Sequence, residues 1–153
     1  CFSLMVPGSY EKELISFQHD EGTSIFGCDA WAVYSNISLK VAEGVETKVV
    51  DIDLSVKFGG DSGTALNTWI FIFVWKKVID GGYHHTHKWI VKADPDAVFF
   101  PHRLRPIVAA KVGVGYINNC KYGLHGPIEV LSAAAIHTLE KDYAASYDGK
   151  APK

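Results

Sequence analysis

The segment from Trp89 to Phe100 most constrains the fold, because an apolar run leads into two carboxylates one residue apart. Residues 89–91 can form a buried strand, and Asp94 and Asp96 follow them. A strand turns alternate side chains to the same side, so we expect these carboxylates to point at one place. They repel each other unless a cation lies between them, and Mg²⁺ or Mn²⁺ prefers such oxygen ligands. The segment predicts either a metal–diphosphate site or a polar strand-to-turn junction, since Asp-Pro-Asp is ordinary turn chemistry.

The 153 residues suit a single domain with a sizeable core. A hydrophobic fraction of 48% excludes a wholly disordered chain, and a net charge of −2 offers no electrostatic basis for binding nucleic acid. The longest apolar run, residues 69–75, is too short to cross a bilayer. The chain starts at Cys1, so we expect residues 1–153 to be a fragment of a longer protein. Any signal or membrane anchor would then lie outside the fragment.

The three cysteines, Cys1, Cys28 and Cys120, have no metal-ligand spacing and cannot all pair within the chain. The cysteines therefore leave the redox compartment open.

Strand and helix patterns alternate along the first two-thirds of the chain. Strands are expected over residues 1–6, 30–34, 47–56, from 89 through the two aspartates, 116–119 and 128–131. Helices are expected over residues 10–20, 65–79, 101–110 and 132–145, the second capped by Thr64 and deeply packed over residues 69–75. The alternation predicts an α/β fold with a mainly parallel, Rossmann-like central sheet flanked by helices. Ligands of such sheets bind beyond the carboxyl ends of the strands, where Asp94 and Asp96 lie.

An ordered set of short motifs resembles the β-1,3-glycosyltransferases of the Fringe and β-1,3-galactosyltransferase group. That family carries Asp-Ser-Tyr, Asn-Leu-Thr, a helical tryptophan, Lys-x-Asp-Asp-Asp-x-Phe and Gly-x-x-Tyr-x-x-Ser in this order. The matching residues span roughly residues 55 to 140 and are Asp61-Ser62, Leu66-Asn67-Thr68, Trp75, Lys92 to Phe99 and Gly126 to Ser132. Pro95 replaces the middle aspartate of the metal motif, and Gly63 replaces the tyrosine that follows Ser62.

The resemblance implies a nucleotide-sugar-binding fold of the A type, Mn²⁺ or Mg²⁺, and transfer from a UDP-sugar in the Golgi or secretory lumen. The acceptor would be a hydroxyl of a glycan, a glycoprotein or a small molecule. By the same resemblance, Asp96 would be the direct metal ligand, and Asp94 would contact the ribose or a metal-bound water. Further substrate contacts would come from Val6 and Pro7 near the uracil, Asn67, Lys92, His125 and Gly126.

The catalytic base has one candidate within the chain. Glu129 is the carboxylate beside the Gly126-Pro127 turn and could accept the acceptor's proton. The family's acidic catalytic segment is expected beyond Lys153, which would leave this fragment with the donor half of the enzyme.

Three other interpretations stay open. Asp51 and Asp53 follow an apolar run and resemble the nucleophile and acid/base pair of haloacid-dehalogenase phosphatases. His85 and His87 would share one face of an extended chain and could bind zinc, although a polar surface loop explains them as well. The third is a non-catalytic nucleotide- or carbohydrate-binding module.

Overall fold

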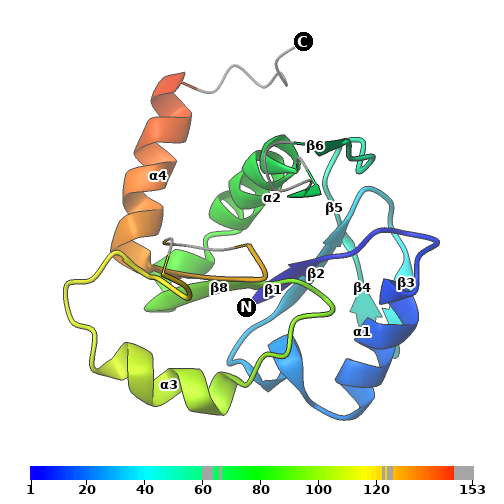
Figure 1. Ribbon diagram of the computed structural model, residues 1–153, viewed down its shortest axis with the longest axis horizontal. Coiled ribbons are helices and arrows are strands. Elements are labelled where there is room, and N and C mark those ends of the chain that lie inside the picture. The colour runs from blue at the N-terminus through cyan, green and yellow to red at the C-terminus, as the bar shows by residue number, and fades with distance from the viewer. Residues whose placement is uncertain (60–63, 66, 122, 124–125, 147–153) are drawn as a thin grey trace.

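The computed structural model describes residues 1–59, 64, 65, 67–121, 123 and 126–146 and contains a six-stranded central sheet (Figure 1). The strand order is β5-β2-β1-β8-β10-β9. β5, β2, β1 and β8 are parallel, whereas β10 is antiparallel to both β8 and β9. The bounds are β1 Phe2–Leu4, β2 Ala32–Ser35, β5 Lys48–Val49, β8 Trp89–Ala93, β9 Tyr116–Ile117 and β10 Ile128–Ser132. The expectation of a mainly parallel α/β sheet is confirmed.

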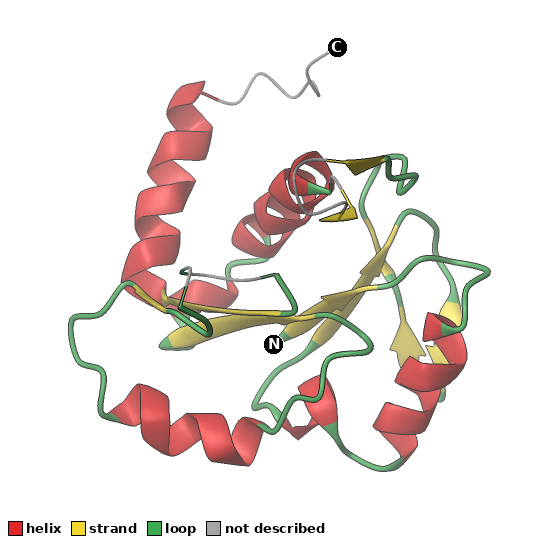
Figure 2. Ribbon diagram, viewed as in Figure 1, coloured by secondary structure: helices red, strands yellow, loops and turns green. Residues whose placement is uncertain are grey.

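Four α-helices and two 3-10 turns surround the sheet in the described part of the chain (Figure 2). They are α1 Glu11–Asp20, η1 Ser24–Gly27, α2 Thr68–Asp80, η2 Tyr83–His85, α3 Pro101–Ala109 and α4 Ala133–Ser146. Two small hairpins add β3 Lys40–Ala42 with β4 Val45–Glu46, and β6 Phe58–Gly59 with β7 Thr64–Ala65. Within the described residues, no helix is both long and apolar enough to cross a membrane.

Hydrophobic side chains cover both faces of the sheet, because neighbouring residues of each strand point to opposite sides. Ile90 of β8 packs on the side of α2 and α4, in a cluster that includes Trp75 and Ile136. The next residue, Val91, packs on the other side with Ile15 of α1. Figure 1 shows the same division, with α2 and α4 above the sheet and α1 and α3 below it.

The strand expected over residues 47–56 is wrong beyond its first residues, because β5 contains only Lys48 and Val49. Val50 N–H still donates to Ser35 O of β2, but the later N–H groups bond locally: Ile52 N–H donates to Val50 O, and Ser55 N–H donates to the carboxylate of Asp53. Local turns of this kind compete with strand pairing at the edge of a sheet. Alternating apolar residues therefore did not distinguish a strand from an irregular edge segment.

The helix expected from Ala65 begins later, at Thr68, because residues 64 and 65 pair with β6 as strand β7. The expectation that residues 69–75 are deeply packed holds for one side of the helix only. Trp69 is 47% exposed, whereas Ile70, Val74 and Trp75 are buried. A helix beside a sheet buries one stripe of side chains at intervals of three to four residues, however apolar its other face is.

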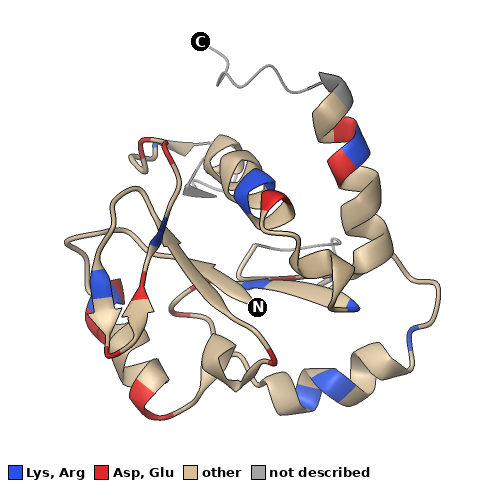
Figure 3. Ribbon diagram, turned by 180° about the vertical axis from the view of Figure 1, so that it is seen from behind, with Lys and Arg blue, Asp and Glu red and all other residues tan. Residues whose placement is uncertain are grey.

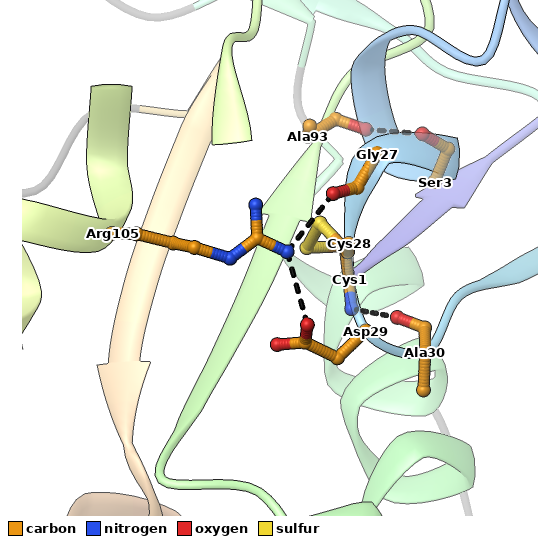
Figure 4. Close-up of a disulfide and its surroundings, with 8 residues drawn as sticks. All are labelled: Cys1, Ser3, Gly27, Cys28, Asp29, Ala30, Ala93 and Arg105. Atoms are coloured by element: carbon orange, nitrogen blue, oxygen red, sulfur yellow. Dashed lines mark hydrogen bonds and ion pairs between the residues drawn. A yellow bond between two sulfur atoms is a disulfide. The ribbon is translucent and has the colours of Figure 1, made fainter. Parts of the chain in front are cut away.

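A disulfide between Cys1 and Cys28 links the start of β1 to the segment that follows η1 (Figure 4). Beside it, the guanidinium of Arg105 on α3 donates to Gly27 O and to the carboxylate of Asp29, both at 3.0 Å. These contacts attach α3 to the loop between η1 and β2.

Charged residues of both signs are distributed over the described elements. On the side seen in Figure 3, α2 and α4 each carry both acidic and basic residues, whereas α3 carries only basic ones.

Candidate functional site

The carboxyl ends of β1 and β8 form the point at which the strand order reverses. From β1 the chain continues through α1 to β2 on one side, whereas β8 lies on the other side of β1. In open α/β sheets, the loops that diverge at such a point leave a crevice where ligands bind. Val6 and Pro7 follow β1 here, and Asp94 to Asp96 follow β8.

Asp94 and Asp96 lie on a turn and not on the strand that the sequence predicted. β8 ends at Ala93, Asp94 N–H donates to Pro127 O, and Ala97 N–H donates back to Asp94 O at 3.0 Å. Pro95 has no N–H to donate to a strand partner, and an aspartate before a proline favours a turn. The prediction that a strand turns both aspartates to the same side was therefore wrong. The backbone instead forms the polar strand-to-turn junction that the sequence also allowed.

The two carboxylates nevertheless interact, and a third joins them. Asp96 raises the pKa of Asp94, whose largest cause of elevation is burial. Burial also raises the pKa of Glu11, and the negative charges of Asp96 and Asp94 raise it further. Glu11 is the first residue of α1, and its carboxylate accepts the N–H of Val6 at 2.6 Å. Three acidic groups thus meet at the switch point.

The sequence patterns did not identify Glu11 as a site residue. One signal was available, because a helix that directly follows a strand starts at the carboxyl edge of the sheet. The sequence patterns did not identify Tyr10 either. In the structure its hydroxyl donates to Asp96 Oδ2 at 3.1 Å.

Hydrogen bonds from α1 and β1 hold this turn in place. The amide of the buried Gln18 on α1 donates to Pro95 O at 2.7 Å, and the hydroxyl of Ser3 on β1 donates to Ala93 O at 2.6 Å. The aspartate turn is therefore connected to two neighbouring elements, α1 and β1.

Lys92 lies below the carboxylates and is only 1% exposed. Its ammonium is 2.6 Å from Asp94 Oδ1, donates to Gly126 O, and lies 4.1 Å from the centre of the Phe71 ring. The lysine therefore contacts the predicted residues Asp94 and Gly126, and its charge orients Asp94.

Glu129 lies opposite Lys92 on β10, and its carboxylate is already in contact with two donors. Trp75 Nε1–H donates to it at 3.3 Å, and Lys92 Nζ lies 3.9 Å away. Burial raises the pKa of Glu129 despite both partners. An elevated pKa suits a general base, and its role as the base stays a prediction.

The structure describes some of the remaining predicted residues and not others. Val6 is 40% exposed beside the carboxylates, which leaves its side chain accessible to a ligand. Asn67 precedes α2, and its carbonyl accepts the N–H of Phe71. His125, Asp61, Ser62 and Leu66 lie outside the described residues.

The alternative pair Asp51 and Asp53 lies in the exposed segment after β5, at the edge of the sheet. The Ser55 backbone N–H that Asp53 accepts lowers the pKa of this aspartate. A general acid needs an elevated pKa, so the environment of Asp53 does not favour the phosphatase interpretation.

A further cavity lies elsewhere, near the amino ends of β1 and β8 and beside α3. It encloses about 450 Å³, and its lining includes Trp31, Trp89, Leu104 and Val108. This lining is mainly apolar, and of its charged residues Asp29, Lys88 and Arg105 the first and last are already paired with each other. We therefore place the candidate site at the carboxylates and not in this cavity.

The carboxylates provide part of a metal coordination sphere. Among the described residues, only a histidine group brings three candidate ligand atoms within 4.8 Å of one another. Mg²⁺ and Mn²⁺ do not require three protein ligands, because they commonly bind one or two carboxylates together with waters and substrate phosphates. Asp94 and Asp96 fit that limited role, and a cation beside them would relieve the repulsion that raises the pKa values of Asp94 and Glu11.

Comparison with known proteins finds no matching family, no similar curated protein and no similar solved structure.

Proposed function

We propose that this chain is the donor-binding domain of a metal-dependent glycosyltransferase, with a Rossmann-like fold of the A type. One observation carries the proposal: Asp94, Asp96 and Glu11 lie at the switch point between β1 and β8, where burial and then the negative charge of Asp96 raise the pKa of both Asp94 and Glu11. The ordered motifs that resemble β-1,3-glycosyltransferases add the donor, a UDP-sugar.

In this proposal each residue has a distinct task. Mn²⁺ or Mg²⁺ would neutralise the charge that develops on the leaving UDP. Asp96 is the more exposed carboxylate and contacts the cation. Asp94 is oriented by Lys92 and reaches the ribose or a metal-bound water. Lys92 itself positions Asp94, because its ammonium is buried among protein groups.

The remaining tasks concern the base and the acceptor. Val6 and Pro7 flank the nucleobase at the end of β1. A general base removes the proton of the acceptor hydroxyl, which belongs to a glycan, a glycoprotein or a small molecule. Glu129 is the candidate within the described residues.

The disulfide supports the proposed location in the secretory lumen. Disulfides persist in oxidising compartments and are rare in the cytosol of most cells. The Cys1–Cys28 bond is therefore consistent with a Golgi enzyme.

Calorimetric titration with UDP, with and without Mn²⁺, tests the proposal. We expect binding that requires Mn²⁺, and an Asp96→Asn variant that binds UDP at least tenfold more weakly, a loss of about 1.4 kcal/mol. Asp51→Asn is the matched control, because Asp51 is an exposed aspartate that also follows a parallel strand.

Three results would separate the alternatives. Absent or metal-independent UDP binding contradicts the proposal. Hydrolysis of p-nitrophenyl phosphate that Asp51→Asn abolishes supports the phosphatase. Metal-dependent UDP binding without transfer or donor hydrolysis supports a binding module.

A further inference from the structure

Three imidazole rings meet where η2 packs against α4, on the side of the sheet that α2 and α4 cover. His84 and His85 belong to η2, and His137 lies in the first half of α4. One ring nitrogen from each histidine lies within 4.8 Å of the others. The ring centres are 4.1 Å apart for His84 and His85, 4.7 Å for His84 and His137, and 5.3 Å for His85 and His137.

His84 is a buried histidine whose ring nitrogens have no hydrogen-bond partner among the described residues. It is 3% exposed, and neither its Nδ1 nor its Nε2 forms a hydrogen bond. Glu140 Oε2 is nearest to Nε2 at 3.5 Å, which is too long for a good hydrogen bond. A buried polar group without a partner costs about 1–3 kcal/mol, so this ring nitrogen calls for a ligand.

Glu140 supplies a fourth donor atom. It lies one turn after His137 on the same side of α4, and its Oε2 is 3.3 Å from His137 Nδ1. Glu140 therefore adds one oxygen next to His84 and His137, and the four potential ligands come from two elements, η2 and α4.

We propose that His84, His85, His137 and Glu140 bind one zinc ion. Imidazole nitrogen and carboxylate oxygen are the usual zinc ligands, and four of them form a closed tetrahedral site. A zinc–nitrogen distance of about 2.0–2.1 Å requires ligand nitrogens roughly 3.3 Å apart. The group reaches this spacing by side-chain rotation, because His137 is 46% exposed and His85 is also exposed.

The electrostatic surroundings agree with a metal-binding role for His84. Burial lowers its pKa, and the neighbouring His85 lowers it further. Both effects favour the neutral ring, which keeps a lone pair for a metal. Mn²⁺ and Mg²⁺ prefer oxygen ligands, so this group and the carboxylates at the switch point select different metals.

The ligand set differs from the one suggested by the sequence, which paired His85 with His87. His87 Nδ1 lies 3.0 Å from Tyr83 O and 2.9 Å from Thr86 Oγ1, within the η2 turn. The turn places His84 in the cluster instead, and α4 brings His137 and Glu140 to it. A closed site there would attach α4 to the segment that enters β8.

Competition titration of Zn²⁺ against a chromogenic chelator tests the site. We expect the wild-type chain to bind one equivalent with micromolar or tighter affinity and to gain thermal stability from it. His137→Ala and His85→Ala, which alter exposed side chains and leave the core intact, should each weaken binding at least tenfold and abolish the stabilisation. Glu140→Gln should weaken binding as well.

His87→Ala and His102→Ala are the matched controls and should bind Zn²⁺ like the wild type. Asp96→Asn should also keep its Zn²⁺ affinity, which separates this site from the proposed UDP site. The inference is overturned if the wild type does not bind Zn²⁺, if His137→Ala and His85→Ala bind it normally, or if His87→Ala loses as much affinity as they do.

Discussion

Lys92 carries its positive charge into the interior of the sheet, next to the candidate site. Three groups compensate the charge: Asp94, Glu129 and the aromatic face of Phe71. Taking an ammonium out of water is costly, and good partners offset the cost. The same contacts keep Asp94 in a fixed orientation, so one residue links stability to the geometry of the site.

Replacement of Lys92 by methionine should destabilise the protein by about 2–3 kcal/mol, because two partly buried carboxylates lose their counter-charge. Urea denaturation measures the loss. Lys76→Met is the control, because Lys76 pairs with Asp80 on the exposed side of α2, where such a pair contributes about 0.5 kcal/mol or less. Equal losses in the two variants would contradict the role given to Lys92.

Glu11 should make stability depend on pH. Its pKa is raised in the folded protein, so the folded state holds its proton more tightly than the unfolded state does. Stability contributed by this group is therefore present at low pH and is lost as the pH rises from about 4.5 through the raised value.

Glu11→Gln should accordingly stabilise the protein at pH 7, by about 0.2–1 kcal/mol, and should not do so at pH 4. Thermal unfolding at both values measures the difference. Glu13→Gln, on the exposed side of the same helix turn, should show no such pH-dependent gain. A larger gain in stability at pH 4 than at pH 7 would show that the two aspartates do not repel the charge of Glu11.

The helices contribute to the candidate sites in different ways. α1 starts at the switch point and brings Glu11 and Tyr10 to the aspartate turn, while Gln18 holds that turn from below. α4 packs on α2 and η2 and brings His137 to the histidine cluster. The position of each helix against the sheet therefore decides which side chains meet.

Ile136 attaches α4 to the core, because its side chain is fully buried in the hydrophobic cluster that α4 shares with α2. Ile136→Ala should destabilise the protein by about 3 kcal/mol, through lost burial and the cavity left behind. Denaturant titration measures this value. Thr138→Ala, on the exposed side of the same helix, should change stability by less than about 0.5 kcal/mol. A loss below about 1 kcal/mol for Ile136→Ala would show that α4 is only loosely packed.

At the scale of the whole molecule, the sheet order and the disulfide set the positions of the two ends of β1. The reversal of strand order leaves the carboxyl end of β1 open toward Asp94 and Asp96. At the opposite end, the disulfide and Arg105 hold the loop after η1 and the helix α3. The candidate site is thus opposite a covalently restrained edge.

Reduction of the Cys1–Cys28 bond should destabilise the protein by about 3–4 kcal/mol. The bond closes a loop with a sequence separation of 27 and so restricts the unfolded chain. Thermal unfolding with and without dithiothreitol measures the effect. A variant with serine at both positions should be less stable from the outset and insensitive to the reductant. Equal unfolding temperatures of the oxidised and reduced wild type would contradict this prediction.

Sequence patterns predicted those elements whose burial is local and continuous. The runs in β1, β2, β8 and β10 are short, apolar and bounded by turn residues, and all four are strands. The alternating residues 47–56 failed because the same alternation fits an edge segment whose N–H groups bond to nearby side chains. Two of the three carboxylates of the candidate site were predicted from sequence, because Asp94 and Asp96 are separated by one residue, whereas Glu11 lies far from them along the chain.

The amino-acid sequence alone determined the α/β class and the placement of two aspartates at the end of a buried strand, because these depend on residues that are neighbours along the chain. Only the tertiary structure decided that Glu11 joins those aspartates, that Cys1 pairs with Cys28, and that His84 and His137 share one cluster. Each of these depends on how helices pack on the sheet. That packing brings together side chains whose separation in sequence carries no signal of their proximity.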